Sequence, residues 1–301
     1  MANLKSIRKR ISSVKGTQKI TRAMKMVAAA RLNRAQQRIL AIRPYAVKTA
    51  QVLAEVAAVT DEGASSVSHP LLARRPEKNT LFIVVTSDRG QCGAFNTNLL
   101  RAAERLWRER EAQGQGVQFA VIGRKGREYL RRRNAPIAHI FSEVWDKLDL
   151  ETARNIARVA LKPFVRGEVD AIYVIYNEFK SAMTQRVTAE LLFPLPPTET
   201  TLARSQAKEE WERHREFLFE PDRGSLLERL VPMYVEISIL RALFESMASE
   251  LGARMTAMDS ATKNAAEMIS KLTLDYNRAR QAAITTELME IIGGAEALRE
   301  G

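Results

Sequence analysis

The C-terminal stretch "LRALFESMASELGARMTAMDSATKNAAEMISKLTLDYNRARQAA" (240–283) carries an apolar side chain at every third or fourth residue. A mean step of about 3.6 residues is the period of an α-helix, so these side chains share one side of the helix. No proline follows Pro232. We therefore predict one helix of roughly 60 residues, about 90 Å long at about 1.5 Å per residue. The predicted apolar stripe consists of Leu240, Phe244, Met247, Leu251, Met255, Met258, Ala261, Ala265, Met268, Leu272, Tyr276, Ala279 and Ala283.

A helix of that length needs a partner, and the N-terminal segment 3–58 is the candidate. This segment is rich in Ala, Arg, Lys, Gln and Leu, all of which favour helices. Its first apolar residues follow the 3-4-3 spacing of a coiled-coil seam. We expect Pro44 to kink or end this helix, because proline cannot donate the helical hydrogen bond. The first seam residues are Leu4, Ile7, Ile11 and Val14.

The stretch "KITRAMKMVAAARL" (19–32) moves the apolar pattern to another side of the N-terminal helix. Ile20, Met24 and Val27 form a second stripe on nearly the opposite side. Leu32 then returns to the first side. The pattern therefore predicts two apolar stripes on this helix, one of which packs against the partner helix.

The formal net charge of +12 comes from one segment of the chain. Residues 1–54 hold 13 Lys and Arg and no Asp or Glu, whereas the remainder holds 34 basic and 35 acidic residues. We expect these cations to gather on one side of the N-terminal helix. Such a surface suits solvent, a nucleic acid or an acidic protein. Few aromatic side chains accompany the cations, which counts against stacking on nucleic-acid bases.

Residues 76–200 change in character and alternate short apolar runs with helical patterns. This alternation predicts a parallel sheet covered by helices, and the last two strands are expected to form a hairpin. The predicted strands are 80–87, 117–123, 137–141, 170–179 and 185–194, and the predicted helices are 96–112, 124–133 and 149–166.

The pattern predicts an α/β fold in which a long antiparallel two-helix coiled coil carries an inserted α/β domain. Residues 1–58 form the N-terminal coiled-coil helix, and residues 76–200 form the inserted domain. Residues 201–224 connect that domain to the C-terminal coiled-coil helix, residues 225–301. The sequence "SLLE" (225–228) has the Ser-x-x-Glu pattern of a capping box and is expected to begin this last helix.

The segment "SDRGQCGAFN" (87–96) follows a predicted strand, where nucleotide-binding folds place a phosphate loop. It lacks the full Gly-x-Gly-x-x-Gly pattern and any Gly-Lys-Ser/Thr, so a structural turn is favoured over a nucleotide-dependent enzyme. In such a turn, Asp88, Arg89 and Asn96 bind backbone groups, and Cys92 is a small, semi-buried side chain. The residues expected to shape this turn are Asp88, Arg89, Gly90, Cys92, Gly93 and Asn96.

The composition excludes several classes of function. A single cysteine rules out an internal disulfide and a cysteine metal cluster, and the three histidines have no metal-ligand spacing. No recognised catalytic motif is present, so we expect no catalytic residue, no cofactor and no metal. No apolar run reaches the roughly 18 residues that a membrane-spanning helix needs.

Several blocks of the sequence resemble the family of γ subunits of rotary ATP synthases, the central shaft of those enzymes. The stretch "IRKRISSVKGTQKITRAMKMVAAARL" (7–32) is similar to the family's opening signature. Residues 87–96 are similar to its SDRG-x-CG-x-FN loop, with Ala94 where glycine is common. The stretches "SELGARMTAMDSATKNAAEMI" (249–269) and "LTLDYNRARQAAITTELMEIIGGAEAL" (272–298) resemble its C-terminal block. The blocks occur in order and cover effectively the whole chain.

The resemblance implies a non-catalytic rotor subunit whose Rossmann-like domain binds no nucleotide. Such a shaft turns inside a hexamer of α and β subunits and couples rotation of the membrane ring of c subunits to ATP synthesis. It also binds the ε subunit and regulates ATPase activity and proton flow. The implied location is the cytoplasmic side of the bacterial plasma membrane, as a peripheral subunit. The alternative is a basic coiled-coil protein that binds nucleic acid, although the resemblance implies no nucleic-acid partner.

The resemblance also implies roles for particular residues. Arg280 and Gln281 match positions that touch a loop of the β subunit, and Met24 and Lys25 match the helix that passes acidic segments of β. The implied contacts with β are Lys19, Arg22, Met24, Lys25, Arg254, Arg280, Gln281 and Thr285. The implied tip of the shaft, in an apolar bearing, consists of Leu288, Ile291, Ile292 and Leu298.

Overall fold

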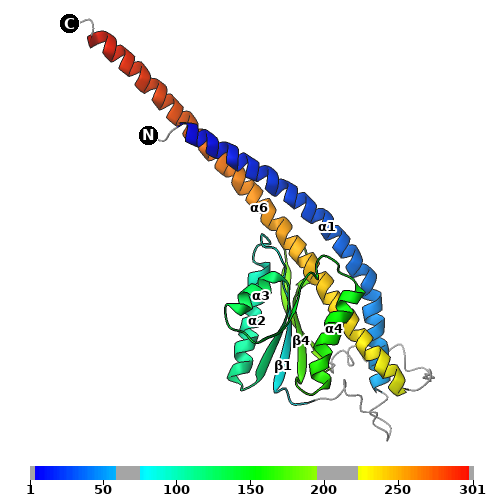
Figure 1. The fold of residues 1–301 in the computed structure, drawn as a ribbon. Coiled ribbons are helices and arrows are strands. Elements are labelled where there is room, and N and C mark those ends of the chain that lie inside the picture. Colours follow the sequence, from blue (N-terminus) through cyan, green and yellow to red (C-terminus); the bar gives the residue numbers. More distant parts are fainter. Residues whose placement is uncertain (1–3, 59–74, 195–222, 298–301) are drawn as a thin grey trace. The chain divides into compact units, whose positions relative to one another are not determined.

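The computed structural model describes residues 4–58, 75–194 and 223–297 of the chain (Figure 1). Two long helices come first and last in the described chain, α1 at Leu4–Ala58 and α6 at Arg223–Ala297. Five strands and three further helices lie between them in sequence. The predicted fold class is confirmed, because the long terminal helices pack together and a mixed sheet is inserted between them.

The chain divides into two compact units, and each contains a part of both long helices. Residues 1–29 and 254–301 form the coil unit, and residues 30–253 form the sheet unit. The described part of the coil unit consists of α1 and α6 alone, whereas the sheet unit also contains the sheet and its covering helices. The predicted connecting segment 201–224 lies outside the described residues except for its last two, which belong to α6.

In the coil unit, α1 and α6 pack antiparallel through polar as well as apolar residues. The Oγ1 atoms of Thr21 and Thr262 lie 2.8 Å apart and share a hydrogen bond. One turn later in α1, Lys25 Nζ donates to Asp259 Oδ1 at 2.6 Å. A later residue of α1 thus meets an earlier residue of α6, which defines the antiparallel direction.

The seam of α1 keeps its 3-4 spacing between residues 18 and 28, through residues that the first predicted stripe did not include. The predicted second stripe lies outside this seam, because Ile20 is 62% exposed and Val27 is 54% exposed. A strict seven-residue repeat keeps two helices in contact through a supercoil. The small and polar residues at the repeat positions therefore stay in the seam. The buried and half-buried seam positions of the coil unit are Leu4, Ile7, Ile11, Val14, Gln18, Thr21, Lys25 and Ala28.

The stripe predicted on α6 is largely confirmed. Met258, Ala265 and Leu272 are buried at intervals of seven residues. Met268, however, is 51% exposed, and Ile269 is half-buried at the next position. The apolar pattern therefore placed one seam position at Met268, whereas the structure has it at Ile269.

Both long helices extend beyond positions where the sequence suggested that they could end. α1 does not end at Pro44 but runs on through Thr49 and Leu53, which are both buried. Proline removes one helical hydrogen bond, and the packing of the following turns maintains the helix. α6 begins at Arg223, so Ser225 lies inside the helix and not at the predicted start.

The sheet has five strands in the order β3-β2-β1-β4-β5. The pairs among β1 to β4 are parallel, and β5 is antiparallel to β4, as the hairpin prediction requires. All strands and helices predicted for this region are present. The strands are β1 Asn79–Val85, β2 Gly116–Ile122, β3 Ile137–Phe141, β4 Ala171–Phe179 and β5 Gln185–Phe193. The helices are α2 Phe95–Ala112, α3 Arg124–Arg131 and α4 Leu150–Val165.

Helices cover both faces of the sheet, and one of them is the long C-terminal helix (Figure 1). Phe82 and Val84 of β1 face α2 and α3, where they pack with Trp107. Ile83 and Val85 face the opposite side, because successive strand residues point to opposite faces. The buried partners on that side from α4 and α6 include Ile156, Phe164, Val235 and Leu243.

Candidate functional site

The sheet has a topological switch point between β1 and β4. β2 and β4 lie on opposite sides of β1, so the chain connections leave β1 in opposite directions. Doubly wound folds bind ligands at such a point, beyond the carboxyl ends of the strands. Residues 86–94 follow β1 and residues 180–184 follow β4, so these two loops frame the first candidate site.

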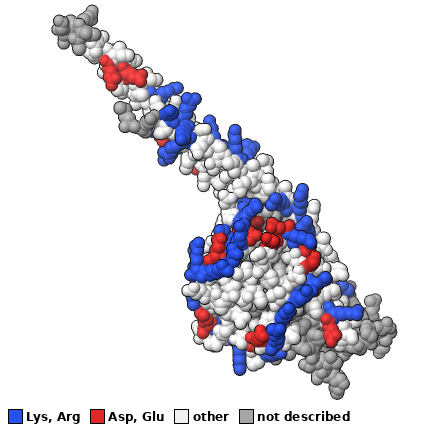
Figure 2. All heavy atoms as spheres, viewed as in Figure 1, with Lys and Arg blue, Asp and Glu red and all other residues white. Residues whose placement is uncertain are grey.

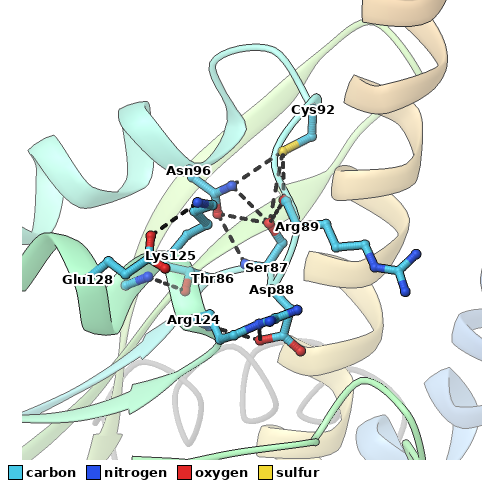
Figure 3. Close-up of polar contacts among 10 residues, drawn as sticks. Thr86, Ser87, Asp88, Arg89, Cys92, Asn96, Arg124, Lys125 and Glu128 are labelled. Carbon is cyan, nitrogen blue, oxygen red and sulfur yellow. Dashed lines mark hydrogen bonds and ion pairs between the residues drawn. The ribbon is translucent and has the colours of Figure 1, made fainter. Parts of the chain in front are cut away.

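The loop after β1 is held by side chains of its own segment (Figure 3). Ser87 N donates to Asn96 Oδ1 at 3.0 Å, and Asn96 Nδ2 donates to Ser87 Oγ at 2.8 Å and Cys92 Sγ at 3.3 Å. Ser87 Oγ donates to the carbonyl oxygen of Arg89 at 2.7 Å. Arg89 thus contributes its backbone, while its exposed side chain points away from the other groups (Figure 3). Cys92 is buried, at 1% exposure, and is not the semi-buried residue that we predicted.

The N-terminal amides of α3 bind oxygen atoms of the same loop. The amide of Arg124 donates to Asp88 Oδ1 at 2.8 Å. The next two amides donate to the carbonyl oxygen of Ser87 at 3.2 Å and to Thr86 Oγ1 at 2.9 Å. Gly123 precedes them with a φ of 91°, and a side chain there would collide with the Thr86 carbonyl group. A helix N-terminus attracts anions, and here the carboxylate of Asp88 occupies that position.

α6 crosses the carboxyl ends of β1 and β4. Ser246 Oγ donates to the carbonyl oxygen of Val85 at 3.5 Å, and Ser249 Oγ donates to that of Asn177 at 2.9 Å. Gly252 approaches the β4–β5 turn so closely that a Cβ atom would lie 3.1 Å from its backbone. α6 therefore occupies the place where other doubly wound folds bind a ligand.

A half-buried ion cluster, which no sequence pattern had indicated, joins α6 to β4 and β5. Arg241 pairs with Glu190, and its Nη1 lies 3.8 Å from Glu245 Oε1. The Tyr176 hydroxyl donates to Glu190 at 2.8 Å. Burial raises the pKa of Glu245, and Arg241 partly offsets this shift. The only signal in the sequence is that Arg241 interrupts an otherwise apolar run of α6.

The coil unit contains a second group of candidate residues, and one of them is already paired. Lys25 and Lys263 both bind Asp259, at 2.6 Å and 3.0 Å. Their hydrogen bonds, led by that of Lys25, lower the pKa of the Asp259 carboxyl group. The side chains of Lys19 and Arg22 are exposed. These two cations thus lie on the surface, whereas Lys25 belongs to the seam.

The cations of α1 do not share one side of the helix, so that prediction is wrong. Arg8, Lys15 and Arg22 each directly follow a seam residue. Arg31 and Arg38 each directly precede one. The exposed cations therefore flank the seam on both sides, and Figure 2 shows many Lys and Arg but few acidic residues along the long helices.

The C-terminal part of α6 exposes apolar side chains. Every described side chain from 284 to 295 is exposed, including Leu288, Ile291 and Ile292. These three residues recur at helical spacing and form one apolar side. Leu298, the fourth predicted tip residue, lies outside the described residues.

The remaining predicted contact residues are mostly on the surface. Arg280, Gln281 and Thr285 are exposed, and Thr285 Oγ1 donates to the Gln281 carbonyl oxygen at 3.0 Å. Arg254 and Met24 are half-buried. The structure therefore places these residues on both long helices without gathering them into one cluster.

The described residues offer neither a metal site nor a membrane span. They contain no group of three or more His, Cys, Asp or Glu side chains able to hold a metal ion. In the same residues, no helix has the length and apolar character needed to cross a membrane.

Comparison with known proteins indicates the same family that the sequence blocks resemble, along nearly the whole chain. A family model described as ATP synthase matches residues 3–298. The ATP synthase gamma chain of Sorangium cellulosum (strain So ce56) is 58% identical and is covered completely, as is this chain. The ATP synthase gamma chain of Geobacter sp. (strain M21) is 50% identical, with 99% of this chain and all of that chain covered.

Solved structures with a similar fold come from mitochondrial ATP synthases. The first is a chain of the central stalk and c-ring of the Tetrahymena thermophila enzyme, with a TM-score of 0.60 and 26% identity. That match covers 80% of this chain and 99% of the other. A chain of the Euglena gracilis enzyme has a TM-score of 0.67 over 99% of this chain and 95% of the other. Its identity of 19% supports the fold alone.

Proposed function

Because the chain belongs to the ATP synthase gamma chain family, we propose that its two units have separate tasks in that subunit. The chain is the central rotor shaft of the proton-translocating ATP synthase, and it couples rotation of the membrane ring to conformational change at the catalytic β subunits. Its partners are the α and β subunits of the hexamer, the ε subunit and the c-ring. The nucleic-acid alternative finds no support in these relationships.

In this proposal the chain carries no catalytic group of its own. The sheet unit keeps the architecture of a ligand-binding fold, but α6 occupies the switch point and Asp88 occupies the N-terminus of α3. Catalysis of ATP synthesis belongs to the β subunits. The task of the sheet unit is then to hold α6 and to present a surface to ε and the c-ring.

The long helices transmit force to β through many weak contacts. Exposed ion pairs contribute only about 0–1 kcal/mol each, so they can exchange partners as the shaft turns. Exposed cations such as Lys19, Arg22 and Arg280 suit such contacts. Lys25 takes part only by sharing or exchanging its bond with Asp259. The proposed set is Lys19, Arg22, Met24, Lys25, Arg254, Arg280, Gln281 and Thr285.

The apolar end of α6 is the part that enters a bearing. Leu288, Ile291 and Ile292 are exposed on one side of the helix, and an apolar surface of this kind needs a sheltered environment. A smooth apolar contact has no directional bonds, so it allows rotation. We place the subunit on the cytoplasmic side of the bacterial plasma membrane, attached through the complex, where it regulates ATPase activity and proton flow.

The observation that carries the function is the full-length match to gamma chains, together with the antiparallel packing of the two terminal helices. The test is reconstitution of the purified chain with α and β subunits. We expect steady ATPase activity that depends on adding the chain. A mixture that stays inactive, although the three subunits associate, would contradict the proposal.

A truncation tests the assignment of the tip. Removal of residues 284–301 leaves the seam intact, because the described part of that segment is exposed. We expect the truncated chain to associate with the α and β subunits, but the complex to produce less torque when it rotates under load. A matched control replaces Met183, which is 82% exposed in the β4–β5 turn, with serine and should change nothing.

A further inference from the structure

The outward side of α4 carries a row of cations that the proposed shaft function does not use. Arg154, Arg158, Lys162 and Arg166 recur at every fourth position and are exposed. Four-residue spacing keeps side chains on one side of a helix, and the row spans about 18 Å at about 1.5 Å per residue. Figure 2 shows a band of Lys and Arg where Figure 1 places α4.

An apolar groove lies beside this row, between α4 and α6. The two helices line an open groove of about 380 Å³. Its apolar lining comes from Ala157, Leu161 and Val165 of α4 and from Pro232 of α6. Val165 is 52% exposed, so the groove is open to solvent at this end. Apolar side chains of a partner would be sheltered here.

The charge of the row is only partly neutralised within the sheet unit. Arg154 Nε lies 3.1 Å from Glu236 Oε1, and Arg166 Nη1 lies 3.8 Å from a carboxylate oxygen of Glu168. Arg158 and Lys162 form no ion pair with any residue that the structure describes. The middle of the row therefore presents two cations directly above the apolar lining.

We propose that this groove binds an acidic amphipathic helix of a partner protein. Carboxylates four residues apart on such a helix would meet the cations, and apolar side chains beside them would fill the groove. A single phosphate ion cannot cover a row of about 18 Å, and it has no use for an apolar lining. A flat lipid surface would contact the cations but not fill the groove. The inference goes beyond the shaft function and does not depend on it.

The test uses the full-length chain and a synthetic helical peptide with glutamate at every fourth position and leucine beside each glutamate. Fluorescence anisotropy measures the affinity of the labelled peptide. We expect R158E/K162E to weaken binding at least tenfold, because it reverses the two unpaired charges. The control R131E/R132E makes the same change in net charge at exposed residues at the end of α3 and should leave the affinity unchanged. Circular dichroism verifies that each variant is folded.

A second variant separates the groove from general charge attraction. Val165→Ser keeps every cation and should weaken the peptide several-fold, whereas an unchanged affinity would overturn the role of the groove. Equal weakening by R158E/K162E and R131E/R132E would overturn the proposal, as would failure of the peptide to bind. Vesicles containing phosphatidylglycerol provide the last comparison. If they bind the chain through Arg158 and Lys162 while the peptide does not, the surface is for lipid and the proposal is wrong.

Discussion

The same helix, α6, is held in two different ways in the two units. In the sheet unit, most of its residues between 227 and 252 are buried, and Val235 and Leu243 are completely so. In the coil unit, burial is confined to a seam that includes Met258 and Leu272. One continuous helix therefore passes from packing on several sides to packing on one side.

The two parts of α6 therefore draw their stability from different sources. Burying a leucine side chain contributes about 1.5–3 kcal/mol, whereas an exposed ion pair contributes about 0–1 kcal/mol. The sheet unit is thus supported by many large contacts. The coil unit depends on a thin seam and on the helix propensity of its residues. We expect the coil unit to open at a lower free energy than the sheet unit.

The sharpest test compares one leucine from each unit. Leu243→Ala should cost about 3 kcal/mol, because it leaves a cavity in a close-packed core. Leu272→Ala should cost about 1–2 kcal/mol, since its site is covered on one side only. Urea unfolding measures both, with circular dichroism for all helices and tryptophan fluorescence for the sheet unit, which contains Trp107 and Trp145.

The two probes decide whether the units differ. Leu243→Ala should shift the fluorescence transition, whereas Leu272→Ala should shift the circular dichroism transition and leave the fluorescence nearly unchanged. Equal shifts in both signals for both variants would show that the chain unfolds as one unit.

A second comparison uses one carboxyl group from each part of α6. The pKa of Glu245 is raised by burial, so its contribution to stability is complete below about pH 4.5 and declines as the pH rises. The pKa of Asp259 is lowered by its lysine partners, so its contribution is present above about pH 3.8 and is lost as the pH falls.

The stability changes caused by the two substitutions should therefore depend on pH in opposite directions. Glu245→Gln should become more stabilising, relative to the unmodified chain, as the pH rises above about 4.5. Asp259→Asn should become less destabilising as the pH falls below about 3.8. Urea midpoints between pH 3 and pH 8 measure both trends, and parallel pH profiles for the two variants would contradict this assignment.

A smaller effect is expected at the ion pair of the seam. A double-mutant cycle of Lys25→Met and Asp259→Asn should give a favourable coupling that fades as salt rises toward about 1 M, where the Debye length is about 3 Å. Thermal unfolding at two salt concentrations measures it. A coupling that resists salt would indicate a more sheltered pair than the structure shows.

The smallest effect on stability is expected at the apolar end of α6. Ile292→Ser should change the free energy of unfolding by less than about 0.5 kcal/mol, because the side chain is exposed. The same variant should weaken torque in the reconstituted complex if this end lies in a bearing. A large loss of stability in the isolated chain would show that the residue packs within the chain.

The sequence was sufficient for the elements and for part of the seam. Strands such as 80–87 and helices such as 149–166 were found because their apolar patterns are strong and their turns contain breaker residues. The seam was lost between Gln18 and Ala28, because its residues there are polar or small and their exposed neighbours are more apolar. Continuing the alternating steps of three and four residues from Val14, whatever the hydrophobicity of each residue, would have predicted this part of the seam.

The candidate site was harder to predict, because it depends on which elements meet in space. The loop contacts of Asp88 and Asn96 were expected from their tendency to bind backbone groups. That α6 covers the switch point was not expected, because its stretch from Val235 to Leu243 also contains Glu236 and Arg241 and so gives no clear signal of burial on all sides. The cluster around Arg241 joins residues about 50 apart in sequence, and no local pattern reveals such a pairing.

The contacts of Ser246 and Ser249 have a mechanical consequence. Both hydroxyl groups lie on the same side of α6 and hold carbonyl oxygens at the ends of two adjacent strands. Spinning α6 about its own axis would draw both hydroxyls away from the sheet at once, and Gly252 leaves no clearance for a sideways roll. A torsional load on this part of the helix is therefore delivered to β1 and β4 as shear within a hydrogen-bonded sheet, which resists slip far better than a seam of side chains.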